Sequence, residues 1–150
     1  MAIELRRQEL RRMEQHGAEA YPNECCGVLL GKDQDGRKVV TDILPLENAR
    51  ADSPRNRFLI LPEDFVRSDR EARRRGVDIL GFYHSHPDHP ARPSEYDREH
   101  AWPWYTYLIL AVENGAPREI TGWLLTEDRL KFLPEKLAIS GDAAGGPELG

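Results

Sequence analysis

The sequence has no apolar run long enough to cross a bilayer, and its Arg-rich start lacks the apolar segment of a secretory signal. We therefore expect no membrane-spanning segment. The sequence also lacks a basic excess, because 21 Lys and Arg stand against 26 Asp and Glu, a formal net charge of −5. Phosphate backbones are bound by basic surfaces, so this balance argues against a general affinity for nucleic acid.

Cysteine is scarce as well. The two cysteines, Cys25 and Cys26, are neighbours in the sequence. Adjacent Cα atoms lie closer together than ordinary disulfide geometry accepts, so we expect no intrachain disulfide. A chain without a disulfide framework is typical of a reducing compartment, which predicts a cytoplasmic location.

The remaining composition is that of one globular domain. Hydrophobic residues make up 39% and charged residues 31% of 150 residues, and no internal repeat or linker divides the chain. The last residues are rich in Gly, Ala and Pro, a composition that favours disorder. We therefore expect a domain over residues 1–138 and a disordered tail over residues 139–150.

Helices and strands are expected to be interspersed around one sheet. Helix-forming residues and helix-ending signals predict helices from about Ile3 to His16, from Pro62 to Arg75 and from Ser94 to Ala101. Apolar runs between turn residues predict strands over residues 26–30, 38–46, 58–61, 77–83, 104–112, 120–125 and 130–133. The polar stretch from Asn48 to Arg57 is expected to be an exposed loop.

A cluster of metal-binding side chains follows the predicted strand over residues 77–83. His84 and His86 are two residues apart and would share one face of a strand, while Ser94 and Asp97 are three apart and would share one face of a helix. Two imidazoles and a carboxylate suit a zinc ion. Three protein ligands leave a fourth position for water, which is typical of a catalytic zinc site.

Each half of this pattern also has a plainer interpretation. A His-x-His pair on a strand is often only exposed, and Ser94 with Asp97 also fits a helix N-cap with an acid in the first turn. Taken together, in this order and at the junction between a strand and a helix, the residues favour a metal site.

The same residues resemble the motif of the JAMM (MPN+) zinc metalloprotease family. That motif is an upstream Glu, then His-x-His-Pro, then a Ser and, three positions later, an Asp. The segment Tyr21–Gly31 is similar to the N-terminal segment of the family, which would make Glu24 the upstream Glu. The resemblance implies that Glu24 is the catalytic base, that Ser94 stabilises the oxyanion, and that the zinc ligands are His84, His86 and Asp97. Without the resemblance, Glu24 would be predicted to be an ordinary exposed acid at a strand end.

The resemblance also implies a fold and an activity. The fold would be a single MPN/JAB-like domain of the α/β (α+β) class, with a mostly antiparallel curved sheet flanked by helices, as in cytidine deaminases. A stand-alone prokaryotic-type member would hydrolyse the peptide or isopeptide bond after the C-terminal glycine of ubiquitin, a ubiquitin-like protein or a sulfur carrier. Two alternatives stay open: a zinc hydrolase or deaminase acting on a small molecule, and a non-catalytic MPN scaffold. The oligomeric state is left open.

Five further residues are weaker candidates near the site. Cys26 would share a strand face with Glu24, and His89 lies in the loop after the histidines, but a buried hydrophobe and a solvated loop histidine are the commoner roles. Trp102, Trp104 and Tyr105 could line a substrate groove, although aromatic core is the default for so apolar a segment.

Overall fold

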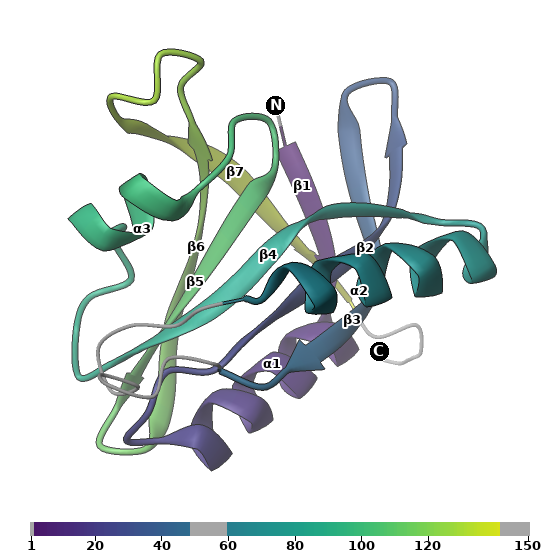
Figure 1. Ribbon diagram of the computed structural model, residues 1–150. Helices are drawn as coiled ribbons and strands as arrows, with labels where there is room; N and C mark the ends of the chain where they lie inside the picture. Colours follow the sequence, from purple (N-terminus) through teal and green to yellow (C-terminus); the bar gives the residue numbers. More distant parts are fainter. Residues whose placement is uncertain (1, 49–59, 142–150) are drawn as a thin grey trace.

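One sheet that closes on itself organises the part of the chain that the computed structural model describes, residues 2–48 and 60–141. The strand order around the ring is β1-β3-β2-β4-β5-β6-β7 (Figure 1). The elements in chain order are β1 Ala2–Arg6, α1 Arg7–Ala20, β2 Cys26–Gln34, β3 Arg37–Leu46, α2 Pro62–Arg75, β4 Asp78–Pro87, α3 Glu95–His100, β5 Thr106–Glu113, β6 Ala116–Leu125 and β7 Phe132–Ser140.

Most neighbouring strands are antiparallel, which confirms the expected mostly antiparallel, curved sheet. The antiparallel pairs are β2 with β3, β2 with β4, β5 with β6, and β6 with β7. Strand β1 runs parallel to both β3 and β7 and so closes the ring. Strand β4 runs parallel to β5, and parallel neighbours need a crossover connection, which here contains α3.

The first residues form a strand, so the helix predicted from Ile3 was placed too early. Ile3 and Leu5 alternate with more exposed residues and are fully buried between β3 and β7. Pairing on both sides outweighs the helix propensity of the neighbouring residues. Helix α1 also continues past the predicted stop at Gly17 to Ala20. Gly17 fits because a Cβ there would already lie 3.1 Å from the side chains of Leu110 and Val112.

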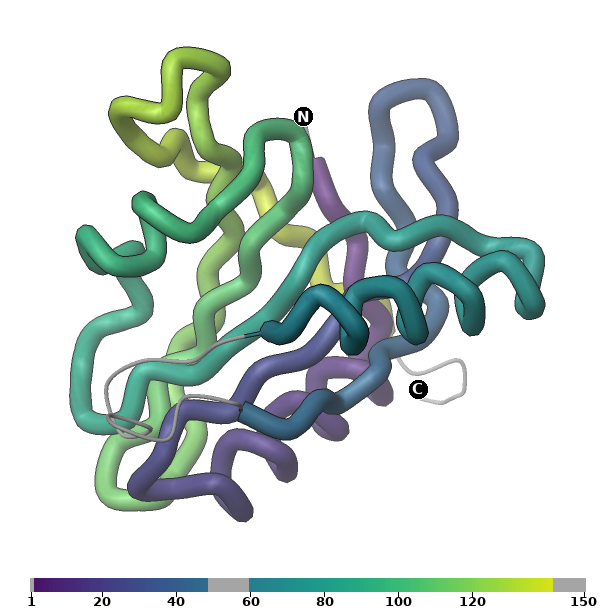
Figure 2. The backbone as a smooth tube through the Cα atoms, viewed as in Figure 1, coloured from purple at the N-terminus to yellow at the C-terminus, as the bar shows by residue number. Residues whose placement is uncertain are grey.

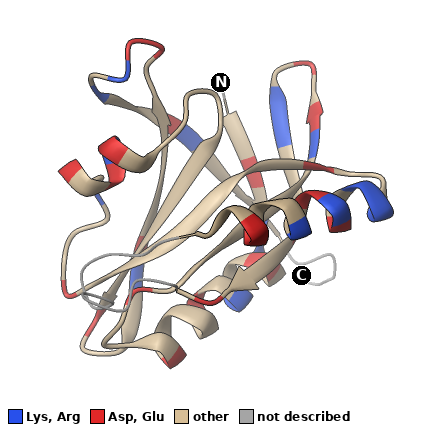
Figure 3. Cartoon of the chain, viewed as in Figure 1, with Lys and Arg blue, Asp and Glu red and all other residues tan. Residues whose placement is uncertain are grey.

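The helices α1 and α2 cover opposite faces of the central strands (Figure 1). Tyr83 of β4 packs in one apolar cluster with Met13 of α1, whereas its neighbour Phe82 packs in another with Ala72 of α2. Adjacent strand residues point to opposite faces, so the two clusters lie on either side of the sheet. The central strands β4 and β5 accordingly carry few charged residues (Figure 3).

The remaining predictions have mixed outcomes. Helix α2 spans the predicted residues and ends at Gly76, which has the left-handed φ of 71° that glycine adopts most easily. Strand β7 begins at Phe132 and continues to Ser140, so it includes the first two residues of the expected tail. Residues 142–150 of that tail, most of the polar loop and residues 58–59 of the strand expected over 58–61 lie outside the described residues. Ile60 and Leu61 belong to no strand.

No helix among the described residues is long and apolar enough to span a membrane.

Candidate metal centre and active site

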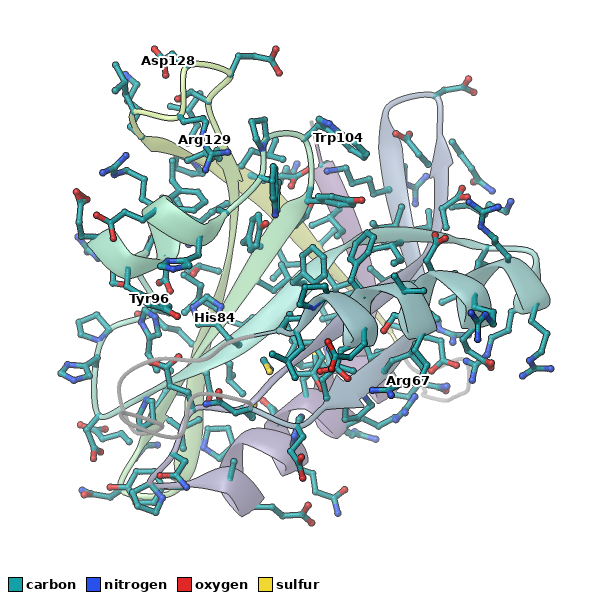
Figure 4. All side chains as sticks on the ribbon, viewed as in Figure 1. Arg67, His84, Tyr96, Trp104, Asp128 and Arg129 are labelled. Carbon is teal, nitrogen blue, oxygen red and sulfur yellow. The ribbon has the colours of Figure 1, made fainter. Side chains whose placement is uncertain are left out.

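Strand β4 positions the two histidines next to each other. In register, His84 lies opposite Cys26 of β2 on one side and Ile109 of β5 on the other. His84 and His86 project from the same face of β4 and are 1% and 6% exposed. Their Nε2 atoms are 3.2 Å apart. Figure 4 labels His84 on β4.

The loop after β4 folds back and brings α3 against the histidines, and its course can be traced along the tube in Figure 2. Asp97 Oδ2 lies 3.1 Å from His86 Nε2 and 3.3 Å from His84 Nε2. The same carboxylate oxygen accepts the Ser94 backbone N–H at 2.8 Å, and the Asp97 N–H donates to Ser94 Oγ at 3.0 Å. This capping box starts α3 at Ser94. The N-cap interpretation and the ligand interpretation therefore describe the same geometry.

The hydrogen bonds of His86 indicate which of its nitrogens is available to an ion. His86 Nδ1 lies 2.9 Å from the carbonyl oxygen of Pro90. Because a carbonyl only accepts, the proton of a neutral His86 belongs on Nδ1, which leaves the lone pair on Nε2. This lone pair faces His84 Nε2 and a carboxylate oxygen of Asp97. These three atoms lie close enough together to bind one cation.

Among the described residues, His84, His86 and Asp97 form the group whose ligand atoms all lie within 4.8 Å of one another. Burial lowers the pKa of His84, which keeps that imidazole neutral at pH 7. Burial alone would raise the pKa of Asp97, but His84 and His86 together lower it, so the carboxylate is ionised. Two neutral imidazoles and one carboxylate fit a divalent metal ion, which requires deprotonated ligands.

Glu24 is buried, not the exposed strand-end acid that its sequence context alone would predict. It lies just before β2 and is 5% exposed, and its Oε1 atom has no hydrogen-bond partner in the described part of the chain. Burial and, secondly, the charge of Asp97 raise the pKa of Glu24 to about 9. A buried carboxyl group with an open oxygen and a strongly raised pKa is typical of proton-transfer sites.

This pKa predicts how the stability of the metal-free protein depends on pH. The pKa of Glu24 is about 9 in the folded chain against an ordinary value of 4.5, so between these values unfolding releases a proton. Stability therefore falls as pH rises through this window. We expect Glu24→Gln, measured in chelator at about pH 8, to raise the melting temperature on the order of 5 °C.

The advantage of the Gln variant should vanish well below pH 4.5, where the folded and the unfolded wild-type chain both hold the proton. Glu127→Gln is the matched control, because Glu127 is exposed. Parallel melting curves for wild type and Glu24→Gln across the whole pH range would contradict the buried, uncharged state of Glu24.

A cleft of about 770 Å³ opens beside the metal centre, with His84 and Asp97 in its lining. The rest of its lining is mainly apolar and includes Phe65, Val66, Phe82, Trp102, Tyr105 and Phe132. The Arg129 guanidinium, which belongs to the same lining, lies 5.6 Å from the centre of the Trp102 ring. Figure 4 labels Arg129 in the turn before β7. The sequence suggested only Trp102 and Tyr105 of this lining, because the other residues come from helices, strands and turns far apart in the chain.

The weaker candidates divide. Trp102 and Tyr105 line the cleft, whereas Trp104 does not and is 68% exposed. His89 is exposed and lies outside the metal-binding group. Cys26 is fully buried, and neither Cys25 nor Cys26 forms a disulfide, as expected.

Comparisons with known proteins converge on one family. The sequence profile described as prokaryotic homologs of the JAB domain matches residues 6–126. A desampylase from Haloferax volcanii is 44% identical over 93 residues, which cover 61% of this chain and 65% of that protein. A probable TtuB-protein conjugate cleaving protease from Thermus thermophilus is 33% identical over 78 residues, 52% of each chain. The match thus spans less than two thirds of either relative.

A solved structure matches over more of the chain. The solution structure of a protein from Desulfitobacterium hafniense has a TM-score of 0.82 and 31% sequence identity, and the match covers 93% of this chain and 94% of that one.

Proposed function

The chain belongs to the prokaryotic JAB family, and on that premise we propose that it is a zinc-dependent peptidase acting on ubiquitin-like or sulfur-carrier proteins. The bond it would hydrolyse is the peptide or isopeptide bond that follows the C-terminal glycine of the carrier. The observation that carries the proposal is the buried group of His84, His86 and Asp97 with the open carboxyl oxygen of Glu24 nearby. The names of the relatives, desampylase and TtuB-protein conjugate cleaving protease, support the substrate class.

The ion would be held by Nε2 of both histidines and by Oδ2 of Asp97. A zinc ion bound there supplies a Lewis acid that polarises a carbonyl and lowers the pKa of water to about 7. The Pro90 carbonyl supports this arrangement, because its hydrogen bond to Nδ1 orients the His86 ring.

Glu24 is proposed to move the proton. Its Oε1 atom would accept a proton from the attacking water and pass it to the leaving amine. For this, Glu24 must first be ionised, although its pKa is raised to about 9 by burial and by the charge of Asp97. The positive charge of an ion held by His84, His86 and Asp97 would offset the charge of Asp97 and so lower the pKa of Glu24 toward the working pH.

Ser94 is proposed to stabilise the oxyanion. Its Oγ accepts the Asp97 N–H, so the position of the oxygen is fixed while its own hydrogen stays available. Ser94 is exposed at the start of α3, where a substrate carbonyl can approach it. A fixed hydroxyl that donates to the developing negative charge acts as one half of an oxyanion hole.

The direct test is cleavage of a defined panel. The zinc-loaded protein would be incubated with ubiquitin, ubiquitin-like proteins and sulfur carriers, each extended beyond the terminal glycine. The masses of the products would be measured by mass spectrometry. We expect a cut immediately after the glycine in at least one carrier, its loss in chelator and its return with zinc. A matched carrier with Val in place of the terminal glycine should resist cleavage. If every carrier stays intact while the protein holds zinc, the proposed substrate class is wrong.

The volume of the cleft is also compatible with an alternative function, hydrolysis or deamination of a small molecule. A volume of about 770 Å³ also lies within the range of small-molecule sites. A small-molecule amidase or deaminase would turn over short amides and leave all carriers intact. The non-catalytic scaffold finds no support, because the chain has all five residues of the motif, Glu24, His84, His86, Ser94 and Asp97.

A further inference from the structure

Side chains, rather than the strand ladder, hold the peptide group that joins Glu24 to Cys25. Its N–H, on Cys25, donates to Ser85 Oγ at 2.8 Å. Its carbonyl oxygen, on Glu24, accepts from Asn48 Nδ2 at 3.1 Å. Both polar atoms of one peptide group are thus bound by side chains that come from β4 and from the segment after β3.

This arrangement lies at the point where the chain enters the sheet, just before β2. The Ser85 N–H still donates to the Cys25 carbonyl at 3.1 Å, as in an antiparallel ladder. In a regular pair, the Cys25 N–H would return the bond to the Ser85 carbonyl, but it bonds to the hydroxyl instead. One residue later, Cys26 pairs with His84 in the ladder. Glu24 therefore lies just outside the regular strand.

Ser85 itself cannot belong to the metal-binding group. It lies between His84 and His86 and so projects from the opposite face of β4. Its side chain is fully buried, near α1, where a Cβ on Gly17 would lie 3.8 Å from Ser85 Cβ. The position of Ser85 allows two roles: filling space under α1, or fixing the backbone at Glu24.

We propose that Ser85 and Asn48 are positioning residues that orient the Glu24 carboxyl group by clamping its peptide plane. The proposal rests on the proposed function, in which Glu24 is the base. Because Glu24 Oε1 has no hydrogen-bond partner among residues 2–48 and 60–141, no described residue holds the side chain at that atom. The direction of its Cα–Cβ bond is set by the backbone, and the backbone here is fixed by the two side-chain hydrogen bonds.

The kinetic test compares Ser85→Ala, Ser85→Thr and Asn48→Ala in the full, zinc-loaded chain. We expect Ser85→Ala and Asn48→Ala to lower kcat by roughly 10–100-fold, with KM and zinc content nearly unchanged. Ser85→Thr keeps the hydroxyl and should restore most of kcat. The matched control is Ser68→Ala, which removes another buried hydroxyl; the Ser68 hydroxyl donates to the Asp64 carbonyl oxygen within α2. Loss of zinc in step with activity would show that Ser85 acts through the histidines and would overturn the proposal.

A second measurement needs no substrate, so it tests the clamp (the hydrogen bonds of Ser85 and Asn48 to the peptide group after Glu24) even if no carrier is cleaved. In wild type and Ser85→Thr, the carboxyl carbon NMR signal of Glu24 should shift when zinc is added. In Ser85→Ala and Asn48→Ala this shift should shrink, and in Ser85→Ala the Cys25 amide should exchange with solvent at least ~10-fold faster. A Glu24 signal that responds to zinc identically in all variants would refute the clamp. Failure of the carrier panel with this NMR response intact would refute only the proposed substrate.

Discussion

Glu24→Gln is expected to lower the rate of hydrolysis at least ~1,000-fold while the protein keeps its zinc. The amide has the shape of the carboxyl group and can occupy the same buried space, but it cannot accept a proton. None of the three ligand atoms belongs to Glu24, so zinc content, measured by elemental mass spectrometry, should equal that of wild type. Steady-state rates on a cleaved carrier would supply the second measurement.

The control for this substitution is Glu127→Gln, which makes the same chemical change at an exposed position. It should retain wild-type rates. A Glu24→Gln protein that keeps more than about a tenth of wild-type activity would overturn the assignment of Glu24 as the base, because a positioned base contributes roughly 100–10,000-fold. Loss of zinc from this variant would instead place Glu24 in the ligand set.

His84→Ala is expected to remove zinc and hydrolysis together. The substitution deletes one of the three proposed ligands and leaves only His86 and Asp97, which are too few to hold the ion tightly. Zinc affinity should fall by more than the roughly 10–100-fold that is typical when a residue hydrogen-bonded to a metal ligand is replaced, and the rate of hydrolysis should fall with it. Titration with a competing chelator gives the affinity, and the same samples give the rate.

His89→Ala is the matched control for this loss, because His89 lies in the adjoining loop, is exposed and is outside the metal-binding group. It should bind zinc and cleave as wild type does. The pair of substitutions in the site also separates two roles: Glu24→Gln should uncouple zinc binding from hydrolysis, and His84→Ala should not. A His84→Ala protein that retains full zinc content would contradict the proposed ligand set.

Local spacing explains why the metal-binding group could be predicted and the surroundings of Glu24 could not. The strand period places His84 beside His86, and the first turn of α3 fixes Asp97, so short-range rules reach all three residues. The burial of Glu24 depends on the register between β2 and β4, in which Cys26 lies opposite His84. No local pattern in the sequence specifies that register, and the role of Glu24 was available only from the family resemblance.

The wrong start of the first helix and the incomplete prediction of the cleft have the same origin, because both depend on contacts between distant parts of the chain. The start of the helix expected from Ile3 was wrong, because pairing of Ile3 and Leu5 with β3 and β7 outweighs local propensity. Most of the cleft was missed, although Trp102 and Tyr105 were candidates, because Phe65 and Phe132 become their neighbours only through the packing of separate elements. In contrast, α2 was predicted to the residue, because its proline start and glycine stop are local signals.

The clamp at Glu24 and the metal-binding group differ in the length of chain that must be closed to form them. His86 and Asp97 are 11 residues apart, whereas Cys25 and Ser85 are 60 apart. The entropic cost of closing a loop grows with its length, and long-range contacts form slowly during folding. Ion binding therefore depends on a short stretch of chain that can assemble early, and hydrolysis depends on the later pairing of β2 with β4, which brings in a segment distant in the sequence. Newly made protein should capture metal before it becomes able to cut.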